Sequence, residues 1–199
     1  RHNNNSIREY IRNFIMSKLE TNTIDTVSGT TNLVIGSTNS STVTFENGAV
    51  TGHMYPAFHA RLNSNQDISN AVTTKVQCGT EELDTDGYYD NATNYRFTPL
   101  VAGKYYVYAQ ANLSANANTN FVHGNIDLQK NGSSIVIYDH NLQSNPGNGL
   151  SVQGNRIIDM NGSTDYLEFF VLMNTNNSTQ RIFGGSTGTT FFGAYRIGA

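Results

Sequence analysis

The chain has 199 residues, and its 12 Lys and Arg against 15 Asp and Glu give a formal net charge of −3. This charge argues against nucleic acid or an acidic membrane as the main partner, and no apolar run approaches the ~20 residues that span a bilayer. The 11 Tyr and 10 Phe argue against a disordered chain and can supply an aromatic core. Together with the 27 Asn residues, which suit a polar surface, they predict an all-β protein with an aromatic core and a polar coat.

The first segment, residues 1–20, carries apolar side chains at a spacing typical of one face of a helix. Ile7, Ile11 and Phe14 follow the four-then-three spacing of a coiled coil. This stripe covers less than two heptads, which is too short for a stable isolated helix. We therefore expect a helix that associates with copies of itself or docks on another protein through these three residues. The alternative is a frayed amphipathic terminus.

The second segment, residues 21–53, contains short alternating apolar runs separated by Gly, Asn and Ser. The runs are Ile24–Val27, Leu33–Ile35 and Val43–Phe45. Each run is too short to bury a face by itself, but such strands become stable when copies from several chains wrap around one axis. The pattern predicts a β-rich shaft or collar, and the alternative is a flexible linker.

Residues 54–199 are expected to form the compact domain, because strand patterns follow one another with turn signals between them. Asn131-Gly132 is a strong signal for a two-residue hairpin, since both turn positions require a positive φ. The candidate strands are Tyr55–Leu62, Lys75–Cys78, Asn94–Thr98, Lys104–Leu113, Val122–Lys130, Ser134–Tyr138, Val152–Met160, Asp165–Met173 and Thr190–Ile197. Eight to ten strands without intervening helices predict a sandwich or jelly roll.

Two of these strands, Lys104–Leu113 and Asp165–Met173, carry large apolar side chains on both faces. A monomeric sandwich would show polar side chains on the outward face. We therefore expect another subunit to cover the second face, in a homotrimer. The side chains expected at this trimer interface are Tyr106, Tyr108, Tyr166, Phe170 and Leu172.

No catalytic constellation is visible in the sequence, and we expect a protein without enzymatic activity, cofactor or bound metal. No His lies at a zinc-ligand spacing from Cys or from another His, and neither a nucleophile elbow nor a Walker loop is present. The single cysteine, Cys78, cannot form an internal disulfide and is expected in a strand as a small apolar residue. The histidines are His2, His53, His59, His123 and His140.

One acidic loop has an alternative interpretation as a calcium site, because carboxylate and carbonyl oxygens at close spacing are ligands for Ca²⁺. The Asp-x-Asp-Gly stretch at 84–87 lacks the further ligands of an EF-hand loop, so a solvated loop is the preferred interpretation. The acidic residues concerned are Glu81, Glu82, Asp84, Asp86 and Asp90.

Four segments of the compact domain resemble, in order, the globular head of complement component one-q. FTPLVAGKYYVYAQ (Phe97–Gln110) resembles the opening of that family's central strand, and LQKNG (Leu128–Gly132) resembles a strand-ending hairpin. NGSTDYLEFFVLM (Asn161–Met173) and FFGAYRIG (Phe191–Gly198) resemble its later strands, although Val107 and Ala109 replace the usual aromatics. The resemblance implies a ten-stranded jelly roll of the tumour necrosis factor type that assembles as a threefold trimer.

Such heads also occur at the tips of bacteriophage fibres and on virion surfaces. The composition of the predicted collar, rich in Asn, Thr and Ser, resembles that of proteins in this setting. The preferred function is therefore a non-enzymatic virion protein, located at the virion surface as a fibre head or knob that contacts a host or another virion component. The alternatives are a capsid cement or decoration protein that docks through its N-terminal segment, and a secreted ligand of the tumour necrosis factor or complement type.

We expect loops on the rigid β scaffold to contact a host glycan or protein. The loops expected to form this contact surface are long, Asn-rich and nearly uncharged. They are Asn63–Ser69, Asn116–Asn120, Asn141–Asn148 and Asn174–Gln180.

Overall fold

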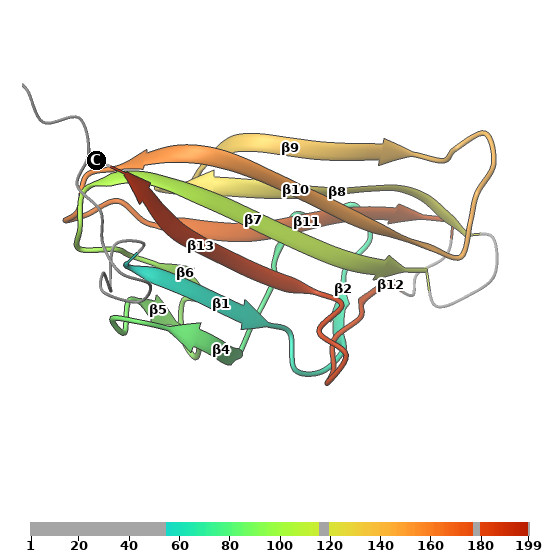
Figure 1. The fold of residues 1–199 in the computed structure, drawn as a ribbon. Helices are drawn as coiled ribbons and strands as arrows, with labels where there is room; N and C mark the ends of the chain where they lie inside the picture. Colours follow the sequence, from blue (N-terminus) through green and yellow to red (C-terminus); the bar gives the residue numbers. More distant parts are fainter. Residues whose placement is uncertain (1–54, 116–119, 177–179, 199) are drawn as a thin grey trace, which may run out of the picture. The chain divides into compact units, whose positions relative to one another are not determined.

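The computed structural model describes residues 55–115, 120–176 and 180–198, which form thirteen strands and no helix (Figure 1). The strands make two antiparallel sheets. Sheet A consists of β1 (Ala57–Arg61), β2 (Gln66–Ile68), β4 (Thr80–Asp84), β7 (Gly103–Ser114), β10 (Gly149–Met160), β12 (Gln180–Ile182) and β13 (Phe191–Gly198). Sheet B consists of β3 (Thr74–Lys75), β5 (Tyr89–Asp90), β6 (Arg96–Phe97), β8 (Phe121–Lys130), β9 (Ser133–Asn141) and β11 (Leu167–Thr175).

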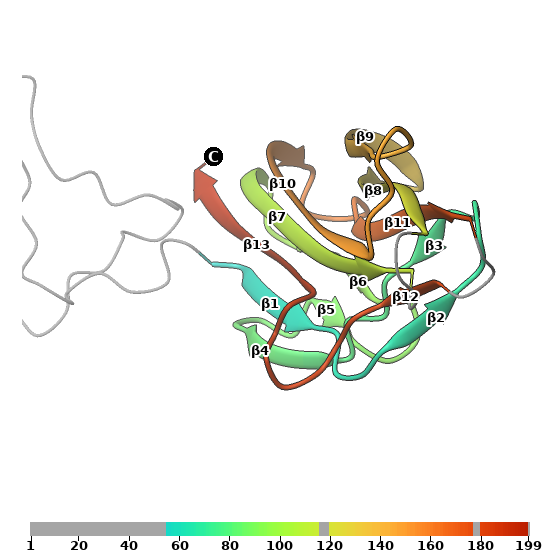
Figure 2. The ribbon, with the colours of Figure 1, turned by 90° about the vertical axis from the view of Figure 1, so that its right-hand side faces the viewer.

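The two sheets face each other across one core, as the view along the strands shows (Figure 2). In sheet A, β7 pairs with β10 on one side and with β13 and β12 on the other, and β13 then pairs with β1. In sheet B, β8 lies between β9 and β11, while β6 and β3 pair with the other edge of β11. Neighbouring strands are thus often distant in sequence, which is the connectivity of a jelly roll.

The core forms because alternate residues of each long strand point inward. On β7, Tyr105 and Val107 are fully buried, and the same alternation continues to Leu113. Aromatic side chains from both sheets meet around Phe58, whose ring stacks on Tyr89 and Phe97 with centroid distances of 4.6 and 4.4 Å. Such stacked pairs add to the free energy gained by burying their area.

All nine candidate segments overlap an observed strand, although Lys75–Cys78 shares only Lys75 with β3. The ten strands implied by the resemblance are fewer than the thirteen that the described residues form. The four strands that the sequence did not predict are short: β2, β4, β5 and β12. They have two to five residues and lack an alternating apolar pattern, so only their pairing with neighbours identifies them.

The expectation that Cys78 lies in a strand is wrong. Cys78 is buried in the core, but it lies in the connection between β3 and β4. The hairpin at Asn131-Gly132 is confirmed, with φ angles of 54° and 75°. The predicted N-terminal helix with Ile7, Ile11 and Phe14 and the predicted collar at 21–53 lie outside the described residues. Within the described ranges, no helix is long and apolar enough to cross a membrane.

The core predicts a large loss of stability for Phe58→Ala. Removing a fully buried ring leaves a cavity among Tyr89, Phe97 and Phe192, and such truncations cost roughly 3–5 kcal/mol. Urea denaturation at fixed protein concentration measures the change. The matched control is Leu100→Ala, because Leu100 is exposed and its truncation should change the free energy of unfolding by less than about 0.5 kcal/mol. Equal losses in the two variants would contradict this description of the core.

Candidate functional site

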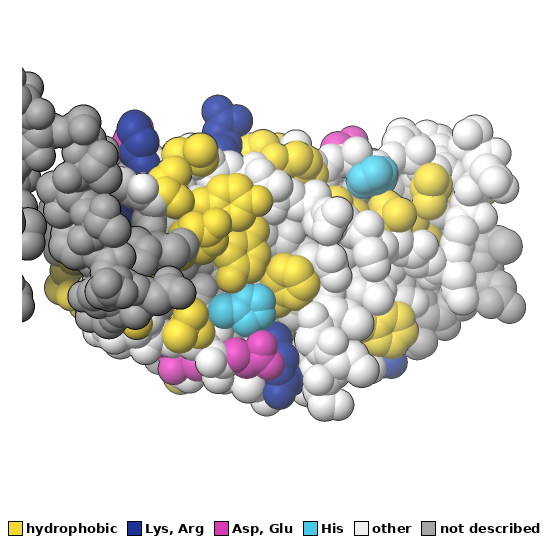
Figure 3. Space-filling model, in the orientation of Figure 1, with side chains coloured by type: hydrophobic (Ala, Val, Ile, Leu, Met, Phe, Trp, Pro, Cys, Tyr) yellow, Lys and Arg dark blue, Asp and Glu magenta, His cyan; other side chains and the backbone are white. Residues whose placement is uncertain are grey.

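An aromatic surface, here called the sheet A patch, lies on the outward face of sheet A. It consists of His59 on β1, Tyr106 and Tyr108 on β7, and Phe191 and Tyr195 on β13, all of them partly exposed. These residues share one face because each alternates with an inward-pointing neighbour. Figure 3 shows hydrophobic side chains gathered on this side of the molecule, next to a histidine and an acidic and a basic side chain.

The rings of the sheet A patch contact one another across three adjacent strands. Tyr106 lies opposite Tyr195 in the register, with a centroid distance of 5.4 Å, and it lies 6.0 Å from Tyr108. Tyr108 in turn lies 6.2 Å from Phe191. Gly193, which pairs with Tyr108, is required here, because a Cβ at this position would clash with the Tyr108 ring. The patch is therefore a packed layer of rings.

One end of the sheet A patch is polar. His59 Nδ1 lies 3.0 Å from the Tyr108 hydroxyl, and His59 Nε2 lies 3.4 Å from Glu82. Arg61 donates to the same carboxylate at 2.7 Å. With Nε2–H directed at Glu82, Nδ1 is the acceptor for the tyrosine hydroxyl. Burial lowers the pKa of His59 below its usual value, and the charge of Glu82 opposes this shift only in part. Burial likewise raises the pKa of Tyr108.

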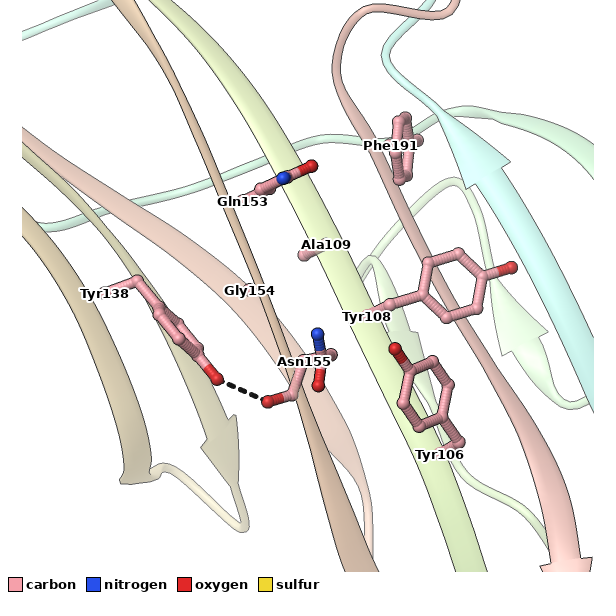
Figure 4. Close-up of a pocket in the computed structure, with 8 residues that line it drawn as sticks. All are labelled: Tyr106, Tyr108, Ala109, Tyr138, Gln153, Gly154, Asn155 and Phe191. Carbon is pink, nitrogen blue, oxygen red and sulfur yellow. Dashed lines mark hydrogen bonds between the residues drawn. The ribbon is translucent and has the colours of Figure 1, made fainter.

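A pocket of about 500 Å³ lies beside the sheet A patch, over β7 and β10 (Figure 4). Its lining residues are aromatic, amide-bearing or small: Tyr106, Tyr108, Tyr138, Gln153, Asn155, Phe191, Ala109 and Gly154. The Tyr138 hydroxyl donates to the backbone carbonyl of Asn155, which ties sheet B to the edge strand of sheet A. Such a lining suits the burial of another protein surface, with amide groups available for hydrogen bonds.

The structure does not bring the five predicted interface residues together. Tyr106 and Tyr108 lie in the sheet A patch, whereas the predicted residues of β11 lie on the outward face of sheet B, on the other side of the sandwich. Those residues are Tyr166, just before the strand, and Phe170 and Leu172 within it.

Two cations of the same chain partly cover the outward face of β11. The Arg96 guanidinium lies 4.7 Å from the centroid of the Tyr166 ring, and Lys75 Nζ lies 5.4 Å from that of Phe170. Lys75 also forms an ion pair with Glu168 at 2.5 Å. These cation–π contacts explain in part why this face tolerates aromatic side chains without a partner.

The acidic loop uses its carboxylates to stabilise turns. Asp84 accepts hydrogen bonds from the backbone N–H groups of Gly87, Tyr88 and Tyr89. Asp90 does the same for the three residues from 92 to 94, and these bonds lower its pKa to about 2. Among the residues that the structure describes, no group of three or more His, Cys, Asp or Glu side chains could hold a metal ion.

Sequence reasoning missed three members of the sheet A patch: Phe191, Tyr195 and His59. The alternation in FFGAYRIG places Phe191, Gly193 and Tyr195 on one face, so the signal was present in the strand pattern. The contribution of His59 depends on the pairing of β1 with β13, which places it opposite Gly193. No local pattern in the sequence predicts that pairing.

The fold of this chain is similar to the folds of two solved structures. The globular domain of zebrafish complement 1qA protein matches 71% of this chain and 97% of its own length, with a TM-score of 0.50 and 15% identity. Eiger TNF from S. frugiperda matches 73% of this chain and 94% of its own, with a TM-score of 0.51 and 10% identity. Comparison of the sequence with family models and with curated proteins gives no match. The fold expected from the sequence motifs, a jelly roll of the tumour necrosis factor and complement head type, is confirmed for the described residues.

His59 predicts a pH dependence of stability. Because its pKa is lowered on folding, the neutral ring contributes stability that is present above the usual histidine pKa of ~6.5 and is lost as pH falls through the folded pKa. His59→Gln keeps a hydrogen-bonding side chain that does not titrate. We expect the free energy of unfolding of the unmodified chain to fall relative to that of His59→Gln between about pH 7 and pH 5. Urea denaturation at each pH measures both, and parallel pH profiles would contradict the assignment.

Proposed function

We propose that this chain is a homotrimeric, non-enzymatic head domain whose subunits associate through the sheet A patch. The observation that carries the proposal is the contiguous layer of partly exposed rings on β7 and β13. A further apolar side chain extends it, because Ile157 on β10 lies opposite Tyr106 and is 56% exposed. Contiguous apolar surface of this kind marks interaction sites on soluble proteins.

Burial of the sheet A patch in an assembly would be favourable. Fully burying an exposed large apolar side chain contributes ~1.5–3 kcal/mol, and the partly exposed rings of the patch would each gain a share of this value. The hydroxyl groups of its tyrosines can still bind partners or water at the rim. The pocket of about 500 Å³ beside the patch gives an incoming side chain a place to insert.

The arrangement of the two sheets argues against a trimer contact that joins the sheet A patch of one subunit to the outward face of β11 of the next. The outward faces of the two sheets point in opposite directions (Figure 2). A contact between opposite faces of successive subunits builds an open stack, whereas a threefold ring closes only if the two contact surfaces lie at an angle. Only one of the two surfaces can therefore belong to the trimer contact. Because Lys75 and Arg96 already partly cover the rings on the face of β11, we assign Tyr106 and Tyr108 to the trimer contact and treat Tyr166, Phe170 and Leu172 as a second surface.

The proposed setting is the surface of a virion, as a fibre head or knob. It is supported by the Asn-, Thr- and Ser-rich segment 21–53, whose short apolar runs suit a shaft made by several chains. Capsid decoration through the N-terminal segment is a variant of the same role. Immunogold electron microscopy of particles purified from the source of the gene tests this setting, and particles that carry no label would contradict it.

A secreted ligand is the second candidate, because the same fold occurs in Eiger TNF. Detection of the chain in the medium of cells that express its complete natural gene, in the absence of particles, would favour this candidate over the virion.

The trimer proposal predicts that Tyr108→Glu converts the protein to a monomer. A carboxylate in a contact that excludes water must lose its hydration without gaining a partner, which costs several kcal/mol. Light scattering coupled to size-exclusion chromatography measures the mass, with one chain of 21.8 kDa as the monomer reference.

The matched control is Ile137→Glu, which places the same charge on an exposed apolar position of β9 in sheet B. We expect this variant to remain trimeric. A monomeric unmodified chain would overturn the proposal, and so would a folded Tyr108→Glu variant that remains trimeric.

A further inference from the structure

A second pocket, here called the amide pocket, lies away from the sheet A patch and has a different chemistry. Its volume is about 320 Å³, and its walls come from the β1–β2, β3–β4 and β5–β6 connections and from the first residue of β2. Five of its lining residues carry side-chain amides: Asn63, Asn65, Gln66, Gln77 and Asn91. Leu62, Ser64, Gly79 and Tyr95 complete the lining, so no charged side chain contributes.

Two of these amides hold the walls of the amide pocket in place. The Gln66 side chain donates to the Lys75 carbonyl at 2.8 Å and accepts from the Gln77 N–H at 3.0 Å, which joins the start of β2 to β3 and to the β3–β4 connection. Asn65 accepts from the Gly184 N–H at 3.1 Å. The other three amides, on Asn63, Gln77 and Asn91, form no side-chain hydrogen bond within the described part of the chain and remain available to a ligand.

Tyr95 supplies the aromatic wall of the amide pocket from an unusual backbone conformation. Its φ of 50° lies in the left-handed region, which is rare for a bulky side chain. Two neighbouring groups impose this turn: Asp90 binds the backbone N–H groups that precede Tyr95, and Lys75 donates to the Asn94 carbonyl at 3.0 Å. Backbone conformations that cost free energy persist where the surrounding structure enforces them, and they are frequent at binding sites.

Gly79 keeps the space beside the Tyr95 ring open. A Cβ at this position would lie 3.9 Å from Tyr95 Cε1 and 3.5 Å from the Asn91 carbonyl oxygen, which are ordinary contact distances. Its φ is not in the left-handed region, so a larger residue fits the backbone here and would fill the pocket.

We propose that the amide pocket binds a neutral sugar ring. A sugar offers hydroxyl groups that both donate and accept, and side-chain amides present matching donors and acceptors. Its C–H face suits the Tyr95 ring, which combines an apolar face with a polar tip. The volume lies at the lower end of the roughly 300–1,000 Å³ found for ligand pockets, which suits a monosaccharide or disaccharide. Because no charged side chain lines the pocket, an acidic sugar would lose hydration without gaining an ion pair.

All residues of the amide pocket belong to one subunit, so the site does not depend on the trimer. In the proposed head domain, a sugar bound here would be a host ligand. It makes use of part of the Asn63–Ser69 loop, which the sequence predicted as a contact surface.

Saturation-transfer difference NMR on the full chain tests the proposal. The probes are glucose, galactose, mannose, N-acetylglucosamine and N-acetylgalactosamine, with glucuronate and N-acetylneuraminate as acidic counterparts. We expect at least one neutral sugar to give a signal and the acidic sugars to give none. If no neutral sugar gives a signal, or if only an acidic sugar does, the proposal is overturned.

Two variants localise the binding. Tyr95→Asn removes the ring and places at this φ a residue that adopts the left-handed region more readily, so the variant should fold with an unchanged or higher melting temperature. Gly79→Leu fills the amide pocket. Both should reduce the signal at least fivefold, while Gly198→Leu, an equivalent change at the end of β13, where an added Cβ meets nothing within 4 Å, should leave it unchanged.

A signal that survives in either folded pocket variant would overturn the assignment. Light scattering on the same samples measures the oligomeric state, so that failure of the sugar proposal can be distinguished from failure of the trimer proposal. A trimer that binds no sugar contradicts only the amide pocket, and a monomer whose sugar binding depends on Tyr95 contradicts only the trimer.

Discussion

Strand β7 is the constraint on which the rest of this structure depends, because its twelve residues place large side chains on both faces of the central strand of sheet A. Tyr105 and Val107 on one face are fully buried against sheet B, while Tyr106 and Tyr108 on the other face are only partly covered. Since the two sets alternate residue by residue, a one-residue shift in register would expose the core and bury the patch. The pairing of β7 with both β10 and β13 fixes that register.

Glycines opposite the aromatic side chains make this arrangement possible. Tyr108 lies across Gly193 in sheet A, and Tyr138 of sheet B lies against Gly154 on the edge strand β10. At both positions a Cβ would occupy the space of the ring. The aromatic side chains can therefore lie flat against the sheets, and the sheet A patch is a layer whose rings are already ordered before any partner binds. Preorganised rings lose little side-chain entropy on association.

The long strands could be predicted from the sequence, because alternation and turn residues are local signals. Each of the nine predicted segments overlaps an observed strand, and the Asn131-Gly132 turn has the positive φ angles that its residues favour. The short strands β2 and β12 could not be predicted, since they exist through pairing between residues 66–68 and 180–182. The same limit applies to the interface. Alternation shows that Phe170 points outward from its own sheet, but only the topology shows that its sheet is not that of Tyr108.

The two candidate surfaces differ in the physical interaction that would drive binding. The sheet A patch is aromatic and extended, so its association with another subunit would derive mainly from the removal of apolar area from water. The amide pocket is small and uncharged, and hydrogen bonds would position a ligand against Tyr95. The patch lies on the outward face of sheet A, whereas the pocket is built from connections between strands. A jelly roll can therefore assemble through the rigid face of one sheet while its connecting segments remain free to vary with the ligand.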